Sequence, residues 1–249
     1  MRLPSRARAL AVSGVILVLS LSTGLASAAV YNPPHAEVFS WDYPSGSPGN
    51  SLGTRYSGTN AWNQLKATGY TAYDFTNTSA STSVSSSYGQ SDAVWAHFGH
   101  ARPGASLFYT SSGGYSELRA DGGVSSYGWP QTSLVSTPGL NDIRLMVFAG
   151  CNTAQSAHPG DWAPYGNLMT AAQQIGVDSV LGFSGTIYWP NMNWWATMFF
   201  QKLREGNSLS ASASSAAGYV LYATGIYAGT DTYSVHNGTV KITPAAYGS

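Results

Sequence analysis

Short apolar runs that alternate with helical stretches are the feature that most constrains how this chain can fold. The runs read as buried strands of a single sheet: AEVFSW (36–41), YTAYDF (70–75), DAVWAHFGHA (92–101), DIRLMVFAGC (142–151) and VDSVLGFSG (177–185). Strands that are apolar nearly throughout are buried on both faces, and strands that alternate with helices favour parallel pairing. The sequence therefore predicts an α/β fold with a mainly parallel sheet and helices on both faces.

The segments between these strands predict helices and two small hairpins. Helices are expected at 60–69 with Asn60 as the cap and Gly69 as the stop, and also at 166–176, 193–206 and 210–223. The polar segment 76–91 lies between two strands, which favours a helix or a crossover. Gly-rich turns predict a hairpin within 106–123, and Asn237-Gly238 predicts the turn of a closing hairpin.

The first residues follow the pattern of a secretory signal peptide. Arg2, Arg6 and Arg8 precede an apolar stretch at 11–26, and a small-residue end, Ala-Ser-Ala, follows. The stretch is short for a membrane anchor and its far end is polar and rich in small residues. We expect cleavage after Ala28 or one residue later, leaving 29–249 as one secreted domain without a stable membrane anchor.

The charge balance disfavours nucleic acid as a partner but excludes no class of partner outright. Removing the signal peptide takes away three of the eleven basic residues, so eight remain against eleven acidic ones, a net charge of −3. A nucleic-acid binder normally needs a basic excess, which this chain lacks. No phosphate-binding glycine motif follows a strand, so no nucleotide cofactor is expected. The sequence leaves the oligomeric state open.

The chain contains a single cysteine, Cys151, at the end of its most apolar strand. An internal disulfide is impossible, so the thiol is an inert buried group, an intermolecular link or a reactive group. A second predicted strand ends in His100. Adjacent parallel strands lie about 4.8 Å apart, so groups at matching ends can meet. A thiol beside an imidazole is a nucleophile beside its base.

These strand ends resemble a known family. AVWAHFGHA (93–101) and LMVFAGCNTA (145–154) are similar to the His-containing and Cys-containing strand ends of the caspase-like cysteine peptidases, which include gingipains, separases and CHAT-domain proteins. The segment 171–217 resembles the CHAT and gingipain-like order of helix, strand, turn, long helix and small-residue helix. The resemblance implies a caspase-like fold and a secreted cysteine endopeptidase that acts on peptides or proteins without a cofactor.

Carried over residue by residue, the resemblance gives each group a role. Cys151 would be the nucleophile and His100 the general base and acid, with hydrolysis through a thioester. The backbone N–H groups of Cys151 and Ala101 would hold the oxyanion. The family usually has glycine after the histidine, so Ala101 departs from the pattern and puts the oxyanion site in doubt, since glycine allows backbone geometries that alanine does not.

His97 competes with His100 and also enters a metal-site alternative. The two histidines are three residues apart, so on a strand they point to opposite faces. We expect His97 to be a packed histidine, hydrogen-bonded within the sheet. A metal hydrolase built from His97, His100, His158 and Asp161 is disfavoured, because the strand splits the ligands and no zinc-type helix motif is present.

Substrate recognition is weakly specified. Asp161 could pair with a basic substrate side chain, although a solvated loop aspartate explains it as well. Tyr188 and Trp189 could form an aromatic wall, although core packing explains them equally. The alternative function is a non-catalytic caspase-like module that binds a cell-surface component or partner protein, and Ala101 and the 13% aromatic content favour it. Thiol reactivity would separate the two functions.

Overall fold

The structure is a computed structural model that describes residues 34–41, 53–87, 92–121, 128–137, 139–156 and 166–242. The predicted signal peptide at 1–28 lies outside these residues, as do His158 and Asp161. The prediction that 29–249 forms one domain is not tested by this structure.

A six-stranded sheet runs through the middle of the molecule, in the order β10-β9-β8-β3-β1-β2. Its strands, in chain order, are β1 (His35–Ser40), β2 (Thr71–Thr76), β3 (Asp92–Phe98), β8 (Leu145–Ala149), β9 (Ser179–Phe183) and β10 (Tyr233–His236). All neighbouring pairs are parallel except β9 and β10. The predicted mainly parallel sheet is confirmed.

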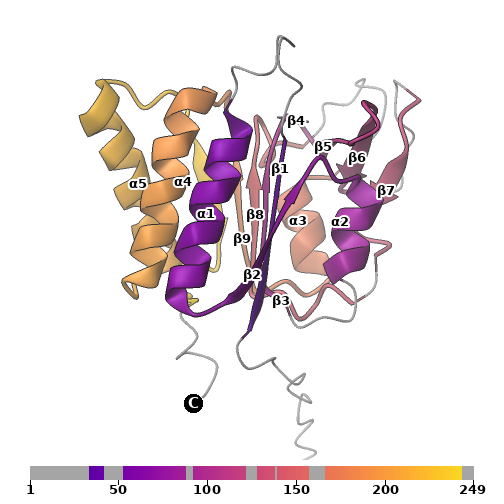
Figure 1. Cartoon of the computed structure of the whole chain (residues 1–249), viewed down its shortest axis with the longest axis horizontal. Coiled ribbons are helices and arrows are strands. Elements are labelled where there is room, and N and C mark those ends of the chain that lie inside the picture. The colour runs from indigo at the N-terminus through magenta and orange to yellow at the C-terminus, as the bar shows by residue number, and fades with distance from the viewer. Residues whose placement is uncertain are drawn as a thin grey trace, which may run out of the picture.

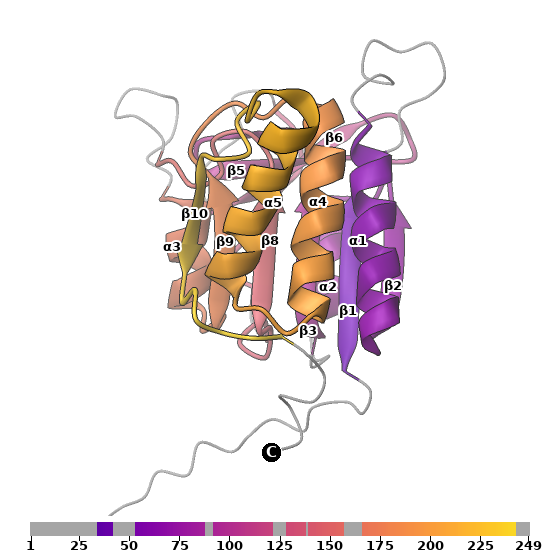
Figure 2. The same cartoon turned by 90° about the vertical axis from the view of Figure 1, so that its left-hand side faces the viewer.

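Helices cover both faces of this sheet, as predicted. They are α1 (Thr54–Thr68), α2 (Ala80–Ser87), α3 (Leu168–Gln174), α4 (Trp189–Arg204) and α5 (Leu209–Thr224). Figure 1 shows α1, α4 and α5 on one face and α2 and α3 on the other, and Figure 2 shows the first three side by side. Two separate apolar clusters fill the spaces between sheet and helices. Burial of these clusters is the main stabilising contribution to the fold.

The central strands supply both clusters because successive side chains point to opposite faces. In β3, Val94, Ala96 and Phe98 pack toward α1 and α4, whereas Trp95 packs with the cluster under α2 and α3. All five residues of β8 are buried. A run that is apolar at every position is therefore what this sheet requires, and it is what the sequence provides.

Two helix starts differ from expectation. The structure begins α1 at Thr54 rather than near Asn60, and Gly53 in the left-handed conformation precedes it. It begins α4 at Trp189 rather than Asn193, with proline in the first turn. The first turn of α1 lacks the apolar spacing that marks its later turns, so the pattern located this helix too late. In α4 the spacing continues back through Met192 and Trp189, but the proline in the first turn concealed the start of the helix. The stop at Gly69 is confirmed by its φ of 105°.

A second, four-stranded sheet lies beside the carboxyl end of β3. Its strands are β4 (Ala101–Arg102), β5 (Ala105–Tyr109), β6 (Tyr115–Arg119) and β7 (Gln131–Ser133), in the order β4-β5-β6-β7. The antiparallel pair β5–β6 is the hairpin predicted within 106–123.

The predicted closing hairpin is wrong. The strand β10 pairs with β9, and the chain after Asn237 turns toward the start of α5 instead of forming a partner strand. There the backbone N–H groups of Ser210 and Leu209 donate to the carbonyls of Gly238 and Val240, each at 2.9 Å. The turn residues were identified correctly, but the chain after them is bonded to a helix terminus.

The polar segment 76–91 contains helix α2, in agreement with the favoured reading of a helix between strands. Among the described residues, no helix is long and apolar enough to cross a membrane.

Candidate active site

The segments that follow β3 and β8 lie against each other at the carboxyl edge of the sheet. The strands are adjacent and parallel, with Phe98 opposite Ala149. The N–H of Gly99 donates to the carbonyl of Ala149 at 3.3 Å, which extends the pairing past the strand ends. His100 and Cys151 each lie two residues beyond the paired positions. The two predicted reactive residues therefore come from neighbouring strand ends, at the edge where open α/β sheets collect functional groups.

Gly150 makes this close approach possible. A Cβ atom built on Gly150 would lie 2.6 Å from the Cβ of Ala101 and 2.8 Å from the carbonyl oxygen of Gly99. Real Cβ atoms essentially never come this close, so a side chain at position 150 would push the two loops apart. The glycine before the cysteine is thus required by the histidine loop across from it.

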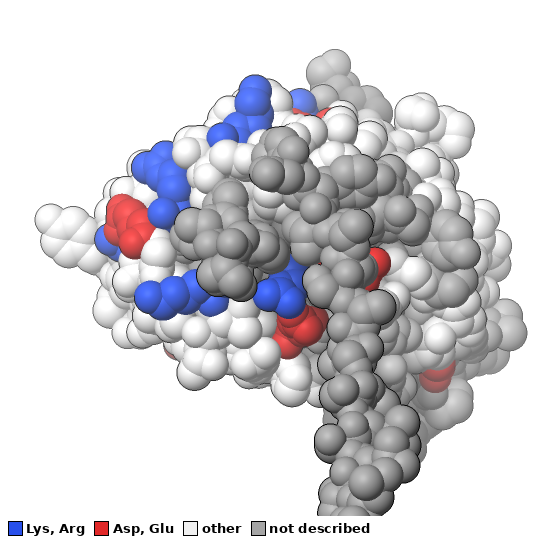
Figure 3. Space-filling view, turned by 90° about the horizontal axis from the view of Figure 1, so that it is seen from below, with Lys and Arg blue, Asp and Glu red and all other residues white. Residues whose placement is uncertain are grey.

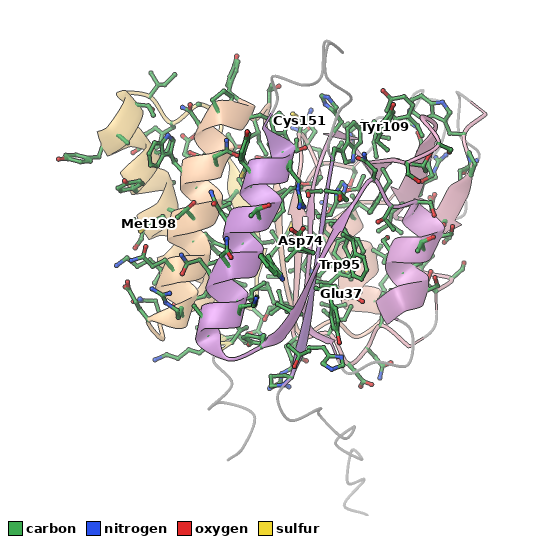
Figure 4. The ribbon with its side chains drawn as sticks, in the orientation of Figure 1. Glu37, Asp74, Trp95, Tyr109, Cys151 and Met198 are labelled. Carbon is green, nitrogen blue, oxygen red and sulfur yellow. The ribbon has the colours of Figure 1, made fainter. Side chains whose placement is uncertain are left out.

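The sulfur of Cys151 points toward the loop that precedes α4. The backbone N–H of Ile187 donates to Sγ at 3.3 Å, and the Ile187 carbonyl is 3.9 Å from the same sulfur. The side chain is half-buried, next to the cluster packed under α4. Figure 4 shows Cys151 at the edge of the sheet where Tyr109 of β5 also lies. The thiol is held from one side and is not sealed in the core.

Thr153 fixes the loop that carries Cys151. Its fully buried hydroxyl donates to the carbonyl of Phe148 at 2.8 Å and approaches that of Gly150 at 3.2 Å. The same oxygen accepts the N–H of Phe183 at 2.9 Å. One hydroxyl therefore satisfies backbone groups at the ends of both β8 and β9, which would otherwise be buried unpaired.

His100 is half-buried beneath an aromatic side chain. Its ring meets Trp41 edge to face, with ring centroids 5.1 Å apart. Its backbone carbonyl accepts the N–H of Leu107 at 2.9 Å, which ties the loop to β5. Burial lowers the pKa of His100 below the usual histidine value of 6.5. The imidazole is therefore mainly neutral at pH 7, the state in which it can accept a proton.

His97 is a packed histidine on the opposite face, as predicted. It is fully buried and stacks on Phe108 with ring centroids 4.0 Å apart. Burial lowers its pKa to about 3, and the backbone of Leu107 acts in the opposite direction. Among the described residues, neither ring nitrogen has a well-formed hydrogen-bond partner, so the expected bond within the sheet is replaced by aromatic stacking.

Ala101 adopts ordinary strand geometry in β4 and is not among the described residues with positive φ. Alanine accordingly occupies the position after the histidine without backbone strain. The bond from Leu107 to the His100 carbonyl makes Ala101 and Ser106 a non-hydrogen-bonded pair, so the N–H of Ala101 points away from β5. Its nitrogen lies 3.5 Å from the Cβ position built on Gly150. The N–H therefore faces the cysteine loop.

The predicted pocket residues separate in the structure. Tyr188, the residue before α4, is 62% exposed, whereas Trp189 is 3% exposed and packs in the core. Asp161 lies outside the described residues, so its pairing with a basic substrate side chain stays a prediction. In the part of the chain that the structure describes, no three His, Cys, Asp or Glu side chains gather as a metal site.

Comparison with known proteins identifies the fold class. No protein-family model matches the chain, and no curated protein matches its sequence. The solved structure of the Arg-specific cysteine proteinase gingipain R matches over 84% of this chain and 47% of its own length, with a TM-score of 0.51 and 9% identity. The fold is caspase-like.

A second solved structure, described as a protease, matches this caspase-like fold over 83% of the chain and 48% of its own length, with a TM-score of 0.57 and 13% identity. The chain thus spans about half the length of each of these two proteins. At such low identity the likeness concerns the fold alone, and the assignment of catalytic residues depends on the geometry described above.

Several residues that shape this site were not identified from the sequence. Trp41 was read only as the end of a strand, yet its ring covers His100. Thr153 gave no signal, because a threonine two residues after a cysteine is common in polar loops. The sequence does contain one clue in Gly99 and Gly150, which interrupt two apolar runs at equivalent positions. Neither has room for a side chain, because Gly99 packs against the rings of His97 and Trp41 and Gly150 against the histidine loop.

Proposed function

We propose that this protein is a cysteine endopeptidase in which Cys151 attacks the scissile carbonyl and His100 transfers the proton. The observation that carries the proposal is the direct contact between the two loops that bear these residues, at the functional edge of a caspase-like sheet. The fold of gingipain R, a cysteine proteinase, supports the same reaction class.

The reaction begins with transfer of the thiol proton from Cys151 to neutral His100. The sulfur then forms a bond to the carbonyl carbon, and the N–H groups of Ala101 and Cys151 hold the developing oxyanion. The C–N bond breaks as the imidazolium protonates the leaving amine. Water, deprotonated by His100, attacks the thioester and releases the acid and the thiol.

The proposed substrates are peptides or proteins outside the cell. Export is inferred from the signal peptide expected at 1–28, and an extracellular setting is consistent with a chain of few charged residues. Tyr188 is the predicted pocket residue that the structure leaves exposed beside the cysteine. We propose that it contacts the substrate near the scissile bond.

Substitution at the two loops tests the proposal. Cys151→Ala and His100→Ala should each lower kcat/KM on a mixed peptide library by about a thousandfold or more, because the nucleophile or its base is lost. His236→Ala is the matched control, since this exposed histidine of β10 lies opposite Val180, toward the amino end of β9. Unchanged hydrolysis in Cys151→Ala would exclude the mechanism.

Thiol alkylation separates the enzyme from the non-catalytic alternative. If His100 activates Cys151, iodoacetamide should modify the wild-type thiol faster at neutral pH than the thiol of His100→Ala. Equal rates in the two proteins, together with no cleavage of any peptide, would favour a binding module.

A further inference from the structure

An exposed apolar surface begins beside Cys151 and extends over the start of α4 and the end of α5. We call it the aromatic rim, and it consists of Tyr188, Tyr222, Ile226 and Tyr227. Tyr222 is 88% exposed and Ile226 60%. Clustered exposed apolar side chains of this kind commonly mark a binding surface.

The rim is continuous with the sulfur of Cys151. Ile187, whose N–H donates to Sγ, immediately precedes Tyr188. The N–H of Tyr188 in turn donates to the carbonyl of Ala228 at 3.1 Å, next to Tyr227. The loop that contacts the thiol is therefore hydrogen-bonded directly to the segment that carries Tyr227.

Backbone and side-chain contacts hold the rim in one shape. The Asn191 side chain donates to the hydroxyl of Thr224 at 3.3 Å, and this hydroxyl donates to the carbonyl of Ile226 at 2.9 Å. Gly229 packs directly on the carbonyl of Thr186, where a side chain would not fit. A surface fixed in advance loses less conformational entropy on binding.

The charge distribution indicates which partner fits. Residues 179–201 and 206–230 contain no Asp, Glu, Lys, Arg or His, and the first charged residue beyond the rim is Asp231. Figure 3 shows Lys and Arg side chains on the opposite end of the molecule, seen from below. Lys66, Lys202 and Arg204 belong to the last turns of α1 and α4, where cations complement the helix dipole.

We infer that the aromatic rim binds an uncharged segment of the substrate polypeptide that carries aromatic or aliphatic side chains. This inference rests on the proposed function, because it takes the substrate to be the polypeptide that Cys151 cleaves. Such a rim would give the site a preference for neutral apolar sequences, whereas gingipain R is described as specific for arginine. Phenol rings suit such contacts because they combine a large apolar face with a polar tip.

The test measures peptide binding without turnover. Fluorescein-labelled peptides of equal length are titrated into Cys151→Ala protein, one set rich in Phe, Tyr and Leu, one in Ser and Gly, and one in Lys and Arg. The apolar set should bind most tightly. Tyr222→Ser combined with Ile226→Ser should weaken that binding on the order of fivefold. Tyr73→Ser, on the edge strand β2 away from the rim, is the matched control and should change nothing.

The outcomes distinguish this inference from the proposed function. Apolar peptides that bind through the rim but are never cleaved by the wild type would refute the endopeptidase and keep the rim. Cleavage whose KM is unaffected by the double substitution would keep the enzyme and refute the rim. Preference for the basic peptides, or binding of neutral lipid vesicles in place of peptides, would also refute the rim as a polypeptide site.

Discussion

The two sides of the candidate active site differ in where they place charge. On the side of the small sheet, Glu117 and Arg119 are fully buried, and Glu117 lies 2.6 Å from Arg102 and 3.5 Å from Arg119. On the side of α4 and α5, the aromatic rim is exposed and uncharged. The chain has few charged residues, yet two of them, Glu117 and Arg119, are buried beside the histidine loop.

This difference in charge placement indicates that the two sides of the site have different roles. Arg102 directly follows Ala101 in β4, so its ion pair with Glu117 holds the strand that carries the proposed oxyanion N–H. A buried ion pair contributes little net stability, but it resists rearrangement because either partner left alone is costly. The side of the small sheet therefore fixes the position of the histidine loop, whereas the side of α4 and α5 offers an exposed surface for a bound polypeptide. The predictions below test this difference in order of decreasing effect.

At neutral pH, Glu117→Gln should produce the largest loss of folding stability. It removes the buried carboxylate charge that pairs with both Arg102 and Arg119, and the free energy of unfolding should fall by about 3 kcal/mol or more. Tyr222→Ser on the opposite side should change it by no more than about 0.5 kcal/mol. Urea unfolding of both variants measures this, and losses of equal size would break the comparison.

Thr153→Val should have the next largest effect. The substitution keeps the shape but removes the hydroxyl that serves Phe148 and Phe183, at a cost of about 2 kcal/mol. Thr153→Ser retains the oxygen and should recover most of the stability. Because the same hydroxyl fixes the cysteine loop, the rate at which iodoacetamide modifies Cys151 should change in the valine variant and return toward wild type in the serine variant.

Gly150→Ala should destabilise the contact between the two loops by roughly 1–3 kcal/mol, since its Cβ meets Ala101 and the Gly99 carbonyl. Adding Ala101→Gly should restore part of the loss, because one of the two clashes disappears. Thermal unfolding of the single and double variants gives the coupling energy between these positions. Additive losses would show that the loops do not touch in solution.

The buried His97 predicts a pH-dependent stability on the sheet side. Its pKa is about 3 in the folded protein and about 6.5 when unfolded, so the unfolded chain binds the extra proton between these values. This contribution is complete above pH 6.5 and is lost as the pH falls toward 3, with a slope approaching ~1.4 kcal/mol per pH unit.

His97→Leu removes that titration and should flatten the dependence of the urea midpoint on pH in this range. His100→Gln is the control, because a half-buried imidazole should affect the slope less. If His97→Leu and the wild type lose stability in parallel, the histidine is not neutral in the folded state.

Much of the fold could be predicted because its determinants are local. Apolar runs fix the strands, and Gly69 in the left-handed conformation ends α1 where the sequence places a stop. The start of α1 could not be predicted, since its first turn is held by contacts from distant parts of the chain. The hydrogen bond between Ser57 and Asn193, residues far apart in sequence, is one of these.

The site was predictable only as a pair of strand ends. The positions of His100 and Cys151 follow from the strands that precede them, but their surroundings depend on elements remote in sequence. Trp41, the residue after β1, reaches His100, and Ile187 reaches Cys151 from the loop before α4. Trp189 is buried and Tyr188 is exposed because of how α4 packs, and the adjacent residues in the sequence do not reveal this packing.

The space between Ala101 and Gly150 admits a single methyl group. Natural variation at these two positions should therefore be coupled: a homologue with glycine after its histidine lacks one of the two clashes that exclude alanine before its cysteine. In an alignment the two columns would covary, with their combined volume kept nearly constant. Such covariation would link the two motifs in sequences too divergent for either motif to be recognised alone.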